Sequence, residues 1–136
     1  MHSSSMVECP NGDLLVAWFH GTGERTANDV VIQGARKKKG ADTWSAPFLM
    51  ADTPDLPDCN PVLFIDAKER LWLFWIPVVA NGWQHGLLKY RRAEDYQGDG
   101  APKWSWQDVI ILDPGEAFPD ALKAGFAQLE AEEGCW

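Results

Sequence analysis

Side chains suited to binding a small polar ligand are concentrated in three short segments of this chain, residues 20–28, 51–60 and 77–86. The candidate residues in them are His20, Glu24, Arg25, Asn28, Asp55, Asp58, Asn60, Trp83, Gln84 and His85, and Asp29 directly follows the first segment. Carboxylates and amides hydrogen-bond hydroxyl groups, and a flat aromatic ring covers an apolar ligand face. These residue types indicate a sugar site, provided that the fold brings the three segments together.

The elements that must position these segments repeat along the chain. Residues 12–19 (Gly-Asp-Leu-Leu-Val-Ala-Trp-Phe) match residues 69–76 (Glu-Arg-Leu-Trp-Leu-Phe-Trp-Ile) at an offset of 57. At the same offset 7–8 fall on 64–65 and 29–32 fall on 86–89, whereas 43–45 match 103–105 at an offset of 60. A period of this length signals a repeat architecture, and four short strands per period predict blades of a β-propeller.

The predicted fold class is all-β, with two four-stranded antiparallel blades followed by a C-terminal helix. Blade 1 covers about 2–50, with strands near 3–8, 13–19, 29–36 and 46–50. Blade 2 covers about 60–112, with strands near 61–65, 71–76, 86–91 and 106–112. Leu122, Gly125, Phe126 and Leu129 have helical spacing, which predicts a helix over about 119–133 with its apolar stripe packed on the blades.

Composition argues against several classes of partner. The net charge of −8 disfavours nucleic acid, because phosphates require a basic surface. No apolar run approaches the length that spans a membrane. Cys9, Cys59 and Cys135 lack the spacing of a zinc site or a disulfide framework, and His2, His20 and His85 lack metal-ligand spacing. We therefore expect no metal and no cofactor.

The turn before each repeated tryptophan carries a family resemblance. Gly40, Thr43 and Trp44 hold their places in a degenerate Asp box, the Ser-x-Asp-x-Gly-x-Thr-Trp turn, whereas Lys37 and Lys39 replace its Ser and Asp. Together with residues 10–19, 60–64 and 70–74, this turn resembles the sialidase-like BNR-repeat family over about residues 2–112. The resemblance implies a six-bladed propeller whose three polar segments open on one face. Two blades cannot close such a ring, so we expect the chain to be an N-terminal fragment of a longer propeller, or the product of a gene truncated at both ends.

The resemblance also implies roles for individual residues. Sialidases use an Asp on the first blade's loop as general acid/base, and this position maps to Asp29, with Glu24 as the second choice. A purely structural role for Asp29, capping a strand or pairing with Arg25, is the alternative. His2 stands where the family's first substrate-clamping Arg is expected, a departure that questions a sialic acid ligand. The other residues expected to shape the pocket are Arg25, Asp58, Asn60, Trp83 and His85.

Three functions remain open at this point. In its full-length form the protein is expected to be an exo-sialidase-like glycoside hydrolase that cleaves a terminal sugar from a glycan. The second hypothesis is a non-catalytic glycan-binding propeller, and the third is a structural repeat scaffold. The expected partners are a glycan or small sugar and the remaining propeller blades. For these to dock, the outer face of blade 2 must expose apolar side chains.

Overall fold

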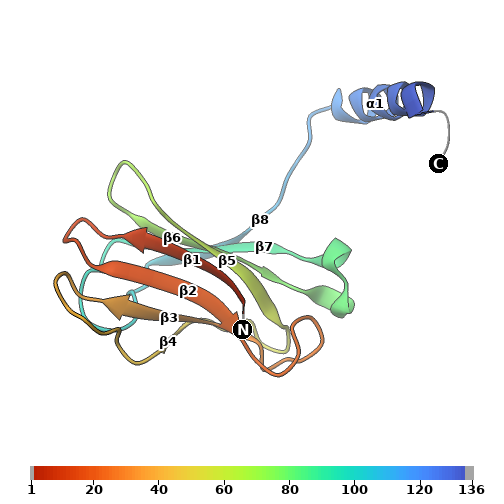
Figure 1. Cartoon of the computed structure of the whole chain (residues 1–136). Helices are drawn as coiled ribbons and strands as arrows, with labels where there is room; N and C mark the ends of the chain where they lie inside the picture. The colour runs from red at the N-terminus through yellow and green to blue at the C-terminus, as the bar shows by residue number, and fades with distance from the viewer. Residues whose placement is uncertain (1, 134–136) are drawn as a thin grey trace.

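The computed structural model describes residues 2–133 and contains two antiparallel sheets of four strands each (Figure 1). The strands of the first sheet are β1 (His2–Glu8), β2 (Leu14–His20), β3 (Val31–Lys37) and β4 (Phe48–Ala51). The strands of the second sheet are β5 (Asp58–Ile65), β6 (Leu71–Pro77), β7 (Leu88–Ala93) and β8 (Trp106–Ile110). Within each sheet, every strand pairs with the next one along the chain. The predicted all-β fold class, with two such sheets and one helix after them, is confirmed.

The repeat extends to irregularities of the backbone. β1 pairs with β2 through a register shift between His2 and Ser5, and β5 pairs with β6 through a shift between Cys59 and Val62. Each shift contains one left-handed residue, Ser3 with φ 56° and Asn60 with φ 50°. These two residues are also 57 positions apart, so both copies carry the same β-bulge near the start of their first strand.

The third strand of each sheet departs from the predicted offset. Leu14 pairs with Lys37 in the first sheet, and its counterpart Leu71 pairs with Ala93 in the second, so β3 and β7 are related by an offset of 56. The predicted match of 29–32 with 86–89 is therefore wrong by one residue. Trp18 and Gln33 are paired across residues 19–32, which are 14 residues, whereas Trp75 and Lys89 are paired across residues 76–88, which are 13. The connection between paired positions is therefore one residue shorter before β7. Because side chains alternate between faces, this correction decides which residues of β3 and β7 are equivalent.

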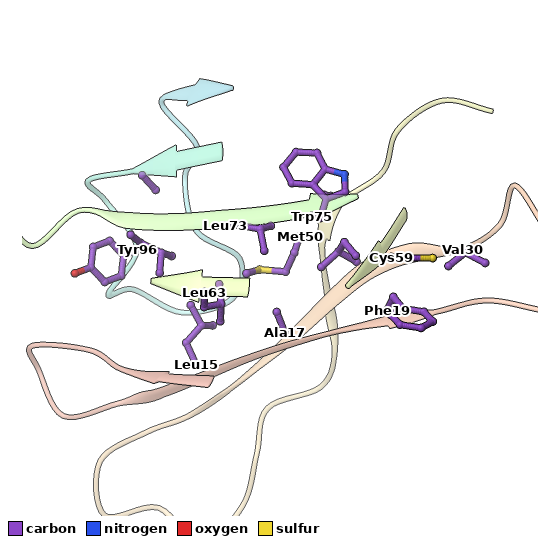
Figure 2. Packing of buried hydrophobic residues seen from close by; sticks show 14 of the residues in the cluster. Leu15, Ala17, Phe19, Val30, Met50, Cys59, Leu63, Leu73, Trp75 and Tyr96 are labelled. Carbon is purple, nitrogen blue, oxygen red and sulfur yellow. The ribbon is translucent and has the colours of Figure 1, made fainter. Parts of the chain in front are cut away.

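Alternation along the two central strands forms the core between the sheets. We call the face of each sheet that carries Leu15 or its counterpart Trp72 the forward face, and the opposite face, with Leu14 or Leu71, the rear face. The core joins the forward face of the first sheet to the rear face of the second. Its fully buried side chains include Leu15, Ala17 and Phe19 from β2, and Leu71, Leu73 and Trp75 from β6. In Figure 2, Leu15 and Ala17 face Leu63 and Leu73 of the second sheet.

The C-terminal helix does not pack as predicted. Helix α1 (Phe118–Glu133) has an apolar stripe whose Phe118, Leu122 and Phe126 are 50%, 46% and 59% exposed. Figure 1 shows it extending away from both sheets on the segment that follows β8. The predicted packing on the blades is wrong, because helical spacing indicates an apolar stripe but not the element that packs against it. The side chain of Leu129 lies outside the described residues. Within residues 2–133, no helix is long and apolar enough to cross a membrane.

We predict that the contact between the sheets dominates stability. Leu73→Ala removes a fully buried side chain from this contact and should lower the free energy of unfolding by about 2–5 kcal/mol, the usual cost of such a cavity. Leu87→Ala is the matched control, because Leu87 is 43% exposed and its truncation should cost about 0.5 kcal/mol or less. Urea denaturation followed by circular dichroism measures both. Equal losses for the two variants would contradict this core assignment.

Candidate functional site

The three polar segments lie together at one end of the paired sheets. They form the loop between β2 and β3 (21–30), the linker between β4 and β5 (52–57) and the loop between β6 and β7 (78–87). The Asp58 amide donates to the Val30 carbonyl (2.9 Å), and the Val78 amide donates to the Pro57 carbonyl (2.9 Å). The Cys59 thiol donates to the Glu24 carbonyl (3.0 Å). These bonds tie all three segments to one another, as the sequence predicted.

An exposed aromatic ring and a guanidinium meet across two of these loops. The 78–87 loop contains two short 3₁₀ turns, Val79–Asn81 and Trp83–His85. The Arg25 guanidinium carbon lies 5.8 Å from the centre of the Trp83 ring, within range of a cation–π contact. Trp83 is 39% exposed, and His85 in the same turn is also exposed. The ring and the cation can therefore contact a ligand arriving from solvent.

Asp29 is exposed and is held in place by one neighbour. Both of its carboxylate oxygens accept from the Thr22 amide (3.1 and 3.2 Å), and one also accepts from the Thr22 hydroxyl (2.9 Å). The hydrogen bond from the Thr22 amide has the largest effect on the pKa of Asp29 and holds it below its usual range. The Thr22 hydroxyl has the next largest effect, and His20 lowers the pKa by less. Asp29 is therefore a carboxylate at neutral pH in the free protein. Its role as general acid/base stays a prediction.

Asp58 lies beneath the loops and has no exposed surface. One carboxylate oxygen accepts from the Thr53 amide (2.7 Å), and the other accepts from the Trp75 indole (2.9 Å). Burial raises the pKa of Asp58, while these hydrogen bonds act in the opposite direction. Asp58 thus holds the linker onto the core. This position differs from the direct sugar contact predicted from the sequence, because the buried carboxylate cannot reach a ligand at the surface.

The remaining predicted residues occupy different positions. Glu24 is exposed in the 21–30 loop, next to Arg25 in the chain. Asn60 is half-buried at the bulge of β5, where its left-handed backbone suits an asparagine. The backbone of His2 pairs with Phe19, and its side chain lies outside the described residues. Sugar contacts by these residues stay predictions.

Three residues that shape the site were not predicted from the sequence: Thr22 orients Asp29, Thr53 binds Asp58, and Cys59 fixes the carbonyl of Glu24. Thr22 stands between two glycines and Thr53 lies five residues before Asp58, but neither position forms a known motif. Burial raises the pKa of Cys59 from 9.0 to about 11, with Glu24 and Asp58 adding smaller effects. Cys59 is therefore a thiol donor rather than a nucleophile at neutral pH.

No cluster in this part of the chain resembles a metal centre. Among the residues that the structure describes, no group of three or more His, Cys, Asp or Glu side chains could hold a metal ion. Hollows of about 430 and 330 Å³ lie elsewhere, one along Arg91 and residues 104–107, the other beside Lys38 and Trp44. The loop surface itself offers hydrogen-bonding groups, the Arg25 guanidinium and the Trp83 ring.

Comparison with known proteins now identifies the family. A family model described as a BNR repeat-like domain matches residues 12–127 of the chain. This chain belongs to the BNR repeat-like domain family. No curated protein sequence matches it.

A solved structure shares the fold of this BNR repeat-like domain. It is the Hadza microbial sialidase Hz136, with a TM-score of 0.63 and 18% sequence identity. The match covers 83% of the present chain and 27% of the sialidase chain. This BNR repeat-like domain therefore spans about a quarter of the length of that sialidase, and the likeness at this identity concerns the fold.

We predict that the thiol of Cys59 reacts slowly in the folded BNR repeat-like domain. A pKa of about 11 in place of 9.0 leaves roughly 100-fold less thiolate at neutral pH. In a Cys9→Ala/Cys135→Ala background, the iodoacetamide rate of the folded protein should still rise about tenfold from pH 9 to pH 10. The same protein unfolded in urea serves as the control, and its rate should level off there. A folded-state plateau at pH 9 would show that the pKa of Cys59 is not raised.

Proposed function

We propose that, in its complete form, the protein is a sialidase-like glycoside hydrolase that removes a terminal sugar from a glycan. The observation that carries this proposal is the meeting of the Arg25 guanidinium and the exposed Trp83 ring on a loop surface that also bears Asp29 and Glu24. A ring for the sugar face, a cation for an anionic group and carboxylates for proton transfer are the groups that such a reaction requires. The sialidase-like fold supports the same proposal.

The proposed chemistry assigns proton transfer to Asp29, with Glu24 as the second candidate. A general acid must hold a proton when the glycosidic bond breaks, whereas the Thr22 hydrogen bonds favour the ionised form of Asp29. Binding of a sugar would remove water from this exposed carboxylate. Desolvation raises the pKa of an acid, so substrate binding itself moves Asp29 towards the protonated form.

The other predicted residues are proposed to shape the sugar pocket. Arg25 can pair with an anionic substituent, and Trp83 can stack on the sugar ring, with His85 and Asn60 offering hydrogen bonds nearby. The side chain at His2 is proposed to replace an Arg of the carboxylate clamp, which favours a substrate other than sialic acid. The remaining catalytic groups are proposed to come from further blades that complete a six-bladed propeller.

One observation favours a second candidate function, a glycan-binding propeller without catalysis. The three hydrogen bonds from Thr22 keep Asp29 ionised in the free protein, which suits an acceptor of sugar hydroxyls as well as a catalyst awaiting substrate. Under this alternative Asp29, Arg25 and Trp83 would bind a glycan that is released unchanged. The two functions share the same residues and differ in turnover.

The deciding experiment uses the complete propeller. Asp29→Asn should lower kcat for a glycoside with a poor leaving group by roughly 10²–10⁴-fold, the usual contribution of general acid–base catalysis. An activated aryl glycoside should lose less, because its leaving group needs little help from a proton. Steady-state hydrolysis of both substrates measures the difference.

Glu24→Gln is the matched control, because it makes the same carboxylate-to-amide change in the same loop. If Glu24 is the acid, the two variants exchange phenotypes. His2→Arg tests the substrate class and should strengthen binding of a carboxylate-bearing sugar. If neither amide variant alters turnover of any glycoside while glycan binding persists and Trp83→Ala removes it, the hydrolase proposal is wrong and the binding module replaces it.

A further inference from the structure

Each sheet leaves one apolar face uncovered. On the forward face of the second sheet, Val62 is 53% exposed, Phe64 54% and Trp106 52%, beside the stacked rings of Trp72 and Phe74. Exposure of this face agrees with the expectation from the repeat. On the rear face of the first sheet, Met6 is 57% exposed and Leu49 54%. Exposed apolar patches of this kind mark interaction surfaces.

The core of the protein already contains a contact between a forward face and a rear face. There the forward face of the first sheet, with Leu15 and Ala17, is packed on the rear face of the second sheet, with Leu71 and Leu73. Trp72 and Phe74 occupy the register positions of Leu15 and Ala17 one repeat later. In the same way, Leu14 and Val16 on the uncovered rear face correspond to Leu71 and Leu73. The two uncovered faces therefore repeat the two halves of a contact that the molecule makes internally.

A buried arginine extends this equivalence to polar groups. Arg36 pairs with Leu15 on the forward face of the first sheet, and its guanidinium donates to the carbonyl of Tyr96, in the segment between β7 and β8. Arg92 pairs with Trp72 at the same position of the uncovered forward face. The carbonyls of Arg36 and Arg92 each accept from the amide of a serine, Ser45 and Ser105, at 2.8 Å. The backbone around both arginines is thus alike. In the single chain the Arg92 guanidinium pairs with Glu94 (3.0 Å) and lies over the Trp72 ring on the uncovered forward face.

We propose that a second copy of this chain occupies the uncovered forward face. The second sheet of one copy packs, through its forward face, on the rear face of the first sheet of the next copy. The internal contact sets the geometry, and Arg92 repeats the cross-sheet role of Arg36. Because the two contacting faces differ, the association is head-to-tail, and it gives a ring where the rotation closes and a filament where it does not. In a longer polypeptide the next blade would take the place of this second copy, so the proposal concerns the chain of 136 residues. The contact does not depend on the proposed enzymatic function.

The experiment blocks one face at a time in the full chain. Phe64→Glu places a charge on the forward face, and Met6→Glu places one on the rear face, both at positions more than half exposed. Leu112→Glu is the control, because Leu112 is 85% exposed and lies outside both faces. Circular dichroism confirms that the variants fold. Light scattering coupled to size-exclusion chromatography gives the mass of each variant over a range of concentrations.

We expect the mass of the unsubstituted chain and of Leu112→Glu to rise with concentration. Each face variant alone should be monomeric, with self-association weakened on the order of 30-fold or more, as for a hot-spot residue. An equimolar mixture of the two variants should form a 1:1 dimer, because each supplies the face that the other retains.

Four results would overturn the proposal. The unsubstituted chain could stay monomeric at all concentrations. The Met6→Glu variant could still associate alone, which would indicate a symmetric contact between two forward faces. Loss of association in Leu112→Glu would show that the segment after β8 holds the copies together. A mixture that stays monomeric would also contradict a head-to-tail contact.

Discussion

The structure depends on one contact, the packing of the first sheet's forward face against the second sheet's rear face. Neither sheet has enough apolar surface of its own to form a closed core, and the buried side chains of β2 and β6 meet at this contact. The loops that carry the candidate site are joined by hydrogen bonds that span the same contact, from Asp58 to Val30 and from Cys59 to Glu24. The position of Trp83 relative to Arg25 and Asp29 therefore follows from how the sheets pack.

Two aspartates of the candidate site show how environment divides similar groups. Asp29 is exposed and its pKa is lowered by hydrogen bonds from Thr22, whereas Asp58 is buried and its pKa is raised by loss of solvent. The first carboxylate is available to a ligand and the second supports the loop from below. Such a division suits a binding surface, because buried groups such as Asp58 hold the loops that carry the exposed groups in place.

Much of the fold could be predicted from the sequence, because the repeat is visible in the apolar runs around Leu14 and Leu71. The shared β-bulge at Ser3 and Asn60 could not, since backbone irregularities leave no apolar pattern. The one-residue change before β7 was missed because the residues of the third strands are too dissimilar to fix a register. The prediction that helix α1 packs on the sheets was wrong. The spacing of Leu122 and Phe126 indicates an apolar stripe but does not indicate which element, if any, packs against it.

The candidate site was only partly predictable for a related reason. The resemblance to sialidase-like propellers implied that the loops with Glu24, Arg25 and Trp83 converge, and the fold brings these loops together. The burial of Asp58 depends on the Trp75 indole, which is 17 residues away in the sequence. The sequence around Asp58 gives no sign of a hydrogen bond to so distant an indole.

The presence of one face of each kind on every sheet has a consequence for how such proteins arise. A gene duplication that copies one repeat adds a sheet whose rear face already fits the forward face before it. The new sheet also carries a forward face for the next one, so the number of blades can change without new interface chemistry evolving first. The shared bulge at Ser3 and Asn60 is the kind of mark that an ancestral blade would leave in all its descendants.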